Sequence, residues 1–184
     1  MQRTFAPPYA CRWVEIFMGI LKAYYLDASA LIKIFIQEKR IDIVRNLISA
    51  KSQIYTTNLC IAEALRVFKR VHLLKKNPGD IETYTTCCLD LISMIIDENI
   101  QIDDQPIFNR EVYDKTEQLI RSHKLDLSDM LQILSVKASF PKRIGMETIL
   151  ITDDENLFCA AKSENIQSVW LRDQDAEKKL GLAT

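Results

Sequence analysis

The chain has 184 residues, enough for one domain with a hydrophobic core, and this length gives little support for two domains. The composition is 48% hydrophobic and 27% charged with only 4 Gly and 5 Pro, which is typical of a helix-rich globular protein and excludes a disordered or fibrous one. The net charge of -1 gives no global attraction to a polyanion. Any nucleic acid would have to be held by local basic faces and bound metal.

The cysteines and the hydropathy pattern indicate a cytoplasmic protein. The 5 Cys residues show no paired spacing, which favours reduced thiols over a disulfide framework. No apolar run approaches the roughly 20 residues that a membrane-spanning helix needs. The first residues also make a poor signal peptide, because Pro7-Pro8 comes early and no clean apolar segment precedes a cleavage site.

In chain order, residues 1–22 fit no element, and we expect them to be an N-terminal appendage outside a single domain at 23–184. Strands are predicted at 24–27, 54–57, 100–102, 148–152 and 168–171. Helices are predicted from Ser29 onward and over about 40–50, 59–75, 81–97, 109–123, 127–139 and 155–163. This alternation predicts an α/β fold with a central parallel sheet of about five short strands between helix layers. The two long helices, separated by Asn77-Pro78-Gly79-Asp80, are expected to form a hairpin.

Four carboxylates lie where a strand pattern ends or a helix pattern begins: Asp27, Glu63, Asp129 and Asp154. In an open parallel sheet, ligands bind beyond the carboxyl ends of the strands. Acids gathered there repel one another, so a cluster is more easily explained if it holds hard divalent cations through oxygen ligands. The pattern therefore predicts a metal-dependent phosphoryl-transfer site.

Each acid, taken alone, has a simpler interpretation. Asp27 and Asp154 precede helices and are suitable helix caps. Asp126 and Asp129 lie three apart at another helix start, where Asp126 would be the cap and the helix dipole would favour Asp129. It is the set of four at sheet-edge positions that favours a functional site.

Glu63 lies inside a helix, and its simpler interpretation is an intrahelical contact with Arg66 or Arg70. Arg66, Lys69 and Arg70 share a face of that helix. This stripe could contact phosphates, although a solvated helix face is the commoner explanation for such charges. If it does, the ligand that the resemblance described below implies is RNA.

Other site classes find no support in the sequence. The 2 His residues are isolated and no Cys/His spacing suggests zinc. The absence of a Gly-rich phosphate loop argues against a P-loop NTPase or a dinucleotide enzyme. A haloacid-dehalogenase-type phosphatase needs a second Asp two residues after the first, where this chain has Ser29.

The four acidic motifs, in their order and approximate spacing, resemble those of PIN-domain ribonucleases, and most of all the VapC-type toxins of toxin–antitoxin pairs. The resemblance covers about residues 23–172. The motifs that carry it are Asp27-Ala28-Ser29-Ala30-Leu31, the helical Glu63, Ser128-Asp129-Met130-Leu131 and Thr152-Asp153-Asp154. It implies a three-layer α/β/α PIN-like fold.

Residue by residue, Asp27 matches the first acid of the family, Glu63 the second and Asp129 the third. Thr152 with Asp154 matches the family's Thr-x-Asp, although Asp153 takes that place if the turn is shifted by one. A further acid is often found two residues later, where this chain has Asn156. That departure would weaken the outer part of the site and its affinity for a second metal.

The resemblance implies an endoribonuclease that uses Mg²⁺ or Mn²⁺ and leaves 5′-phosphate and 3′-hydroxyl ends. Asp27, Asp129 and Asp154 would hold the metal, Glu63 would bind a second ion or an ordered water, and Ser29 and Thr152 would orient the carboxylates. A small antitoxin protein and a homodimer are the implied partners, besides the RNA substrate. The alternatives are a PIN-like RNA-processing nuclease without an antitoxin and a catalytically silent PIN-like interaction module.

Overall fold

The structure is a computed structural model that describes residues 21–36, 39–50, 52–75, 79–104, 106 and 109–182. Residues 1–20, most of the predicted appendage, lie outside the described residues. The strands are β1 (Lys22–Leu26), β2 (Gln53–Thr56), β3 (Gln101–Ile102), β4 (Glu147–Thr152) and β5 (Gln167–Trp170). The helices are α2 (Ala28–Ile32), α3 (Ile41–Ser49), α4 (Asn58–Lys69), the π-helical η1 (Arg70–Leu74), α5 (Ile81–Ile96), α6 (Arg110–His123), α7 (Leu127–Ala138), α8 (Phe140–Arg143), α9 (Glu155–Ser163) and α10 (Ala176–Leu180).

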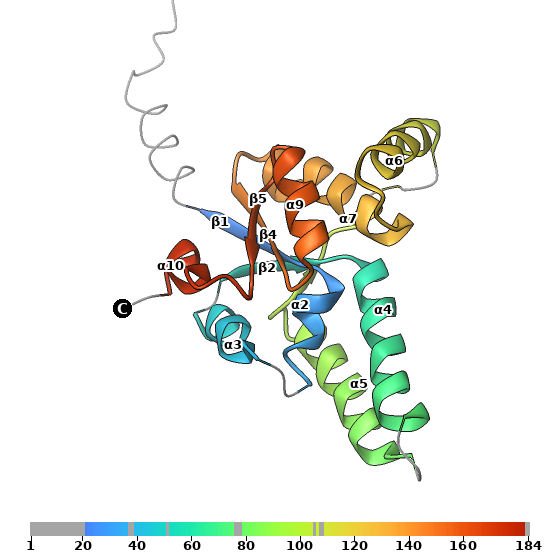
Figure 1. Cartoon of the computed structure of the whole chain (residues 1–184). Coiled ribbons are helices and arrows are strands. Elements are labelled where there is room, and N and C mark those ends of the chain that lie inside the picture. The colour runs from blue at the N-terminus through green and yellow to red at the C-terminus, as the bar shows by residue number, and fades with distance from the viewer. Residues whose placement is uncertain are drawn as a thin grey trace, which may run out of the picture.

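The strands form one all-parallel sheet in the order β3-β2-β1-β4-β5 (Figure 1). The central strand is β1, in which Tyr25 pairs with Tyr55 of β2 on one side and with Leu150 of β4 on the other. The chain winds from β1 toward β2 in one direction and later returns to the opposite side of β1 through β4. The switch in strand order therefore lies between β1 and β4. Parallel sheets bind their ligands at such a point, beyond the carboxyl ends of the two strands.

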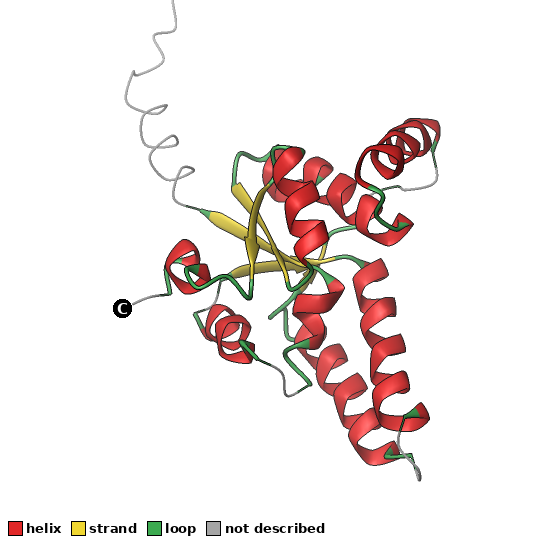
Figure 2. Cartoon of the chain, viewed as in Figure 1, coloured by secondary structure: helices red, strands yellow, loops and turns green. Residues whose placement is uncertain are grey.

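Both faces of the sheet are covered by helices, which makes three layers and confirms the predicted α/β/α fold (Figure 2). Side chains alternate along β1, so Ala23 and Tyr25 face one core while Tyr24 and Leu26 face the other. The first core is closed by α6, α7 and α9, and the second by α2, α3, α4, α5 and α10. Because a parallel strand is buried on both faces, β1 after Lys22 and the centre of β4, Ile149-Leu150-Ile151, are apolar.

The predicted helical hairpin is formed by α4, η1 and α5, which run away from the sheet (Figure 1). The expected single helix over 59–75 changes to a π-helical turn at Arg70, which the sequence did not indicate. At the tip, the backbone N–H of Asp80 donates to the carbonyl oxygen of His72 at 2.7 Å. A side chain at Gly79 would place its Cβ 3.1 Å from the carbonyl oxygen of Leu73, so the tight return favours glycine.

Two short helices were not predicted. The five-residue α10 buries Ala176 and Leu180, and the four-residue α8 buries Pro141. Neither is long enough to produce a helical hydrophobic period.

The described cysteines are all free thiols: Cys60, Cys87, Cys88 and Cys159. Cys11 lies outside the described residues. Among the helices that the structure describes, none combines the length and the apolar character that crossing a membrane requires.

Candidate functional site

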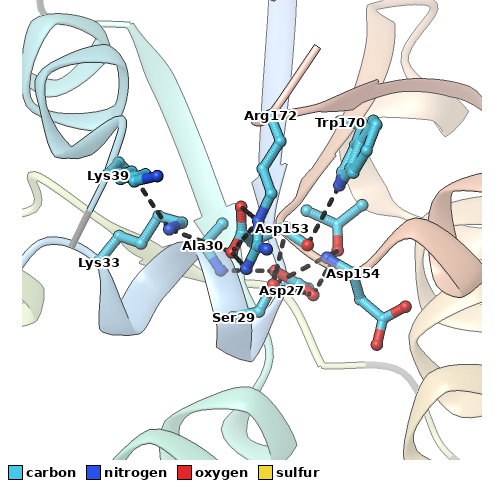
Figure 3. A network of polar contacts seen from close by, with 10 residues as sticks. Asp27, Ser29, Ala30, Lys33, Lys39, Asp153, Asp154, Trp170 and Arg172 are labelled. Carbon is cyan, nitrogen blue, oxygen red and sulfur yellow. Dashed lines mark hydrogen bonds and ion pairs between the residues drawn. The ribbon is translucent and has the colours of Figure 1, made fainter.

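Asp27 follows the last residue of β1 and is both a helix cap and a buried acid at the sheet edge. Its Oδ1 accepts a hydrogen bond from the Ala30 backbone N–H at 2.7 Å, which begins α2. The Ser29 hydroxyl lies 2.9 Å from both carboxylate oxygens (Figure 3). Thr152 Oγ1 donates to Oδ2 at 2.7 Å. The two residues expected to orient Asp27 are therefore in contact with it.

Asp154 lies at the end of the neighbouring strand β4. Its backbone N–H donates to Thr152 Oγ1 at 2.9 Å, so one threonine hydroxyl connects Asp154 to Asp27. The Asp154 carboxylate caps α9 through Oδ1, which accepts from the backbone N–H groups of Asn156 at 2.7 Å and Leu157 at 3.1 Å. Asn156, where the family often has another acid, is thus the second residue of α9 and is exposed.

Asp153, the alternative fourth acid, is directed elsewhere. Its carboxylate lies 3.1 Å from Lys33 Nζ and 2.7 Å from Arg172 Nη2, and its side chain is only 7% exposed (Figure 3). Asp154 lines the cavity described below, and Asp153 is absent from the described residues that line it.

Asp129 and Glu63 are presented by helices. Asp126 caps α7 by accepting the Asp129 backbone N–H at 3.0 Å and the Ser128 hydroxyl at 2.8 Å. Asp129 is therefore fixed in the first turn of α7. Glu63 lies in the second turn of α4, which Thr57 begins by accepting the Cys60 backbone N–H.

The four acids, which are separated by up to 127 positions in the chain (154 − 27), surround one cavity of about 120 Å³. Asp126 joins them as a fifth carboxylate, and among the described residues no Lys or Arg lines this cavity. Two larger hollows of about 920 and 510 Å³ lie along α6, and their described lining includes none of the four acids. The cavity of about 120 Å³ therefore brings five carboxylates together, and we call it the acid cavity.

The electrostatics of the cavity follow from this crowding. Burial raises the pKa of Asp129 to about 7, and the charges of Asp126, Asp154, Asp27 and Glu63 add to the increase. Burial also raises the pKa of Asp27 to about 6, although the hydrogen bonds that it accepts oppose the increase. A negative charge here is costly for the folded protein unless a cation accompanies it.

The pKa values of the two remaining acids of the cavity, Glu63 and Asp126, shift in opposite directions. Partial desolvation and the charge of Asp126 raise the pKa of Glu63, while Arg66 lowers it. The hydrogen bond from the Asp129 backbone N–H holds the pKa of Asp126 below its usual value. Asp126 is therefore ionised more readily than Asp129, which fits a capping role.

The donor set fits a hard divalent cation in its chemistry. Carboxylate oxygens are the ligands that Mg²⁺ and Mn²⁺ prefer, and the uncompensated charge of the cavity favours a cation. Within the described parts of the chain, no group of three or more His, Cys, Asp or Glu side chains is already arranged to hold an ion. Repulsion between the carboxylates, which also raises the pKa of Asp129, opposes a tighter arrangement.

The predicted RNA-contact residues lie outside the cavity, because Arg66 and Lys69 on α4 and Arg70 at the start of η1 are exposed and do not line it. Arg66 is nevertheless close enough to Glu63 to influence its titration.

Two residues near the site were missed by sequence reasoning. Gln132 is buried beside the cavity, where its Oε1 lies 3.2 Å from both Thr57 Oγ1 and Cys60 Sγ. It follows Asp129 by three positions on α7, a spacing that shares a helix face and could have indicated it. Lys33 is buried against Asp153, and no sequence signal points to it.

Comparison with known proteins agrees with this geometry. The model of the PIN domain matches residues 24–164, which is more than half of the chain and includes all four acids. No curated protein matches the chain. With its parallel sheet, its helix layers and this match, the chain belongs to the PIN-domain family, whose members are generally nucleases.

Proposed function

We propose that the protein is a metal-dependent endoribonuclease that hydrolyses RNA phosphodiester bonds. The observation that carries the proposal is the cavity at the carboxyl edge of the sheet, where Asp27, Glu63, Asp129 and Asp154 meet. A cluster of acids with raised pKa values needs a cation to be ionised together, and a cation bound there would attract a phosphate group.

Asp27, Asp129 and Asp154 would hold Mg²⁺ or Mn²⁺, and Glu63 would bind a second ion or an ordered water. When bound, such an ion lowers the pKa of a coordinated water and stabilises the charge that develops on the phosphate. Asn156 stands where a further acid is common in the family, so we expect a second ion to bind more weakly than the first.

The residues around the acids would preset their orientation. Ser29 and Thr152 donate to Asp27 and leave its carboxylate few alternative rotamers. Asp126 holds the backbone of Asp129 through the first turn of α7. Partners of this kind typically matter for metal affinity by about 10- to 100-fold.

The RNA strand would be held beside the cavity by the basic face of α4. Arg66 and Arg70 follow Glu63 by three and seven positions, which places all three on one side of the helix. Phosphate contacts of this type position a strand without reading its sequence.

For the biological role, we propose a toxin of a toxin–antitoxin pair, acting in the cytoplasm and inhibited by a small antitoxin protein. Support comes from the resemblance of the acidic motifs to VapC-type toxins. A neighbouring gene for a small DNA-binding protein that suppresses the toxicity of this chain is expected. If expression of the chain is harmless, or its toxicity has no such suppressor, a PIN-like RNA-processing nuclease becomes the better assignment.

The proposed activity is tested by comparing Asp129→Asn with Asp126→Asn. Both changes remove one negative charge from the cavity, but asparagine at 126 still caps α7. We expect Asp129→Asn to reduce Mn²⁺-dependent RNA cleavage by about 100-fold or more, because it removes a metal ligand, and Asp126→Asn to reduce it less than about 5-fold. Equal losses in the two folded variants would contradict the assigned role of Asp129.

A further inference from the structure

Lys33 is a buried charge close to the acid cavity, in the turn that follows α2. Its side chain is 2% exposed, its Nζ lies 3.1 Å from Asp153 Oδ2, and it also donates to the carbonyl oxygen of Lys39 at 3.0 Å (Figure 3). Lysine is almost never fully buried unless it is paired. Since a buried ion pair adds little net stability over apolar residues of the same size, stability alone is a weak reason for its presence.

Asp153, the partner of Lys33, is held through its backbone as well as its carboxylate. Its N–H donates to Ser29 Oγ at 2.8 Å, and its carbonyl oxygen accepts from Trp170 Nε1 at 3.2 Å. The carboxylate contacts Lys33 on one side and Arg172 on the other. These contacts fix the turn between β4 and α9.

This network leads directly to the acids. The Ser29 hydroxyl that accepts the Asp153 N–H also donates to Asp27, at 2.9 Å. Asp154 follows Asp153 immediately and lines the cavity. A displacement of Asp153 would therefore move Asp154 through the backbone and Asp27 through Ser29.

We propose that Lys33 and Asp153 are positioning residues of the acid cavity, whose ion pair keeps the Asp153 carboxylate out of the cavity and holds Asp154 and Asp27 in it. The inference rests on the proposed metal-dependent function. Asp153 thus lies next to the metal-binding acids without being one of them.

Replacing Lys33 alone distinguishes a positioning role from a simple electrostatic effect of its charge on Mn²⁺ affinity. Removing a cation near a metal site should strengthen Mn²⁺ binding on Coulomb grounds. Loss of positioning should weaken it by about 10- to 100-fold, as loss of partners around metal ligands generally does. The two effects have opposite signs.

The test measures Mn²⁺ affinity by calorimetry, RNA cleavage and thermal unfolding for the wild type, Lys33→Met and the double variant Lys33→Met/Asp153→Asn. Lys33→Met removes the buried partner of Asp153 and leaves that carboxylate with the more exposed Arg172 alone, so the variant is expected to unfold at lower temperature. The double variant removes both members of the buried pair and keeps the net charge, so it is expected to recover thermal stability. A matched control is Lys137→Met/Glu164→Gln, which removes a partly buried pair that does not line the acid cavity.

In the folded double variant we expect Mn²⁺ affinity to stay about 10- to 100-fold below that of the wild type and kcat to fall with little change in KM, while the control stays within about 2-fold. Recovery of Mn²⁺ affinity together with stability would show that the pair is only structural and would overturn the proposal. A wild type that binds no Mn²⁺ and cleaves no RNA would refute the proposed function itself, and the positioning role with it.

Discussion

At the scale of single residues, two of the carboxylates each combine two roles that the sequence presented as alternatives, helix capping and a place in the acid cavity. Asp27 and Asp154 cap helices, and both also line the cavity. Capping uses one oxygen of the Asp154 carboxylate for two backbone N–H groups. Because a carboxylate has about four lone-pair sites, capping does not exclude metal binding. Capping fixes the orientation of the side chain, and a carboxylate held in one orientation is suited to bind a metal ion.

The raised pKa of Asp129 predicts how stability depends on pH in the metal-free protein. Its pKa is about 7 when folded and near 3.8 when unfolded, so the folded state binds the proton more tightly. The associated stability is present below pH 4 and is lost as the pH rises through 7.

Asp129→Asn should therefore match the wild type near pH 4 in thermal unfolding with EDTA and exceed it at pH 8. Because water screens this partly exposed acid, we expect a gain of about 1 kcal/mol, or roughly 2–4 °C in Tm. Mn²⁺ at pH 8 should reverse the order. A variant less stable than the wild type at pH 8 in EDTA would contradict the expectation that the ionised Asp129 destabilises the metal-free protein.

At the scale of elements, α4 carries an acid of the cavity and a basic face on the same helix. Glu63 lies one turn before Arg66, and Lys69 and Arg70 extend the basic face along the exposed side. The overall charge of -1 gives no general attraction to RNA, so local faces of this kind must provide it.

Neutralising Arg66, Lys69 and Arg70 to Gln should weaken RNA binding and flatten its salt dependence, by up to about 2 in the slope of log K against log salt. The control is neutralisation of Lys142 and Arg143, which are exposed on α8 and do not line the acid cavity. Binding measured by fluorescence anisotropy at several salt concentrations checks this. Equal changes per charge in both variants would show that the α4 face has no special role.

Much of this arrangement could be predicted because the signals are local. Asp27 and Asp154 follow short apolar runs that are typical of buried parallel strands, and the alternation of strands and helices brings the ends of these strands together. The choice between Asp153 and Asp154 could not be predicted, since it depends on Lys33 and Arg172, which approach from other segments. The π-helical turn η1 was missed for a similar reason, because residues 70–74 have an ordinary helical composition and the change depends on tertiary packing.

At the scale of the whole molecule, the hairpin exposes an apolar stripe on α5. Ile81, Leu89, Ile92 and Ile96 are 60%, 57%, 46% and 73% exposed, and with Thr85 they follow each other at intervals of three or four residues. The opposite side of α5 is already buried through Cys87 and Leu91. A helix that is apolar on both sides is normally covered on both, which favours the homodimer that the resemblance to VapC-type toxins implies.

Leu89→Glu should convert that dimer into a monomer, because a charge at the centre of an apolar stripe cannot be buried without a partner. Thr83→Glu on the same helix, exposed and on a different face from the stripe, is the matched control and should leave the dimer intact. Light scattering after size exclusion gives the mass, and circular dichroism confirms folding. A monomeric wild type, or a dimeric Leu89→Glu variant, would rule out this interface.

The central claim, that the acid cavity is a metal-dependent nuclease site, is tested most directly by RNA cleavage. The purified protein is incubated with RNA and Mn²⁺ beside a chelated sample and an Asp27→Asn variant, which keeps the shape of the side chain and removes its charge. Cleavage by the intact protein that is lost in both other samples, with 5′-phosphate ends on the products, is the predicted result. Cleavage that persists in the chelated sample or in the folded Asp27→Asn variant, or no cleavage by the intact protein on any RNA, would contradict the claim.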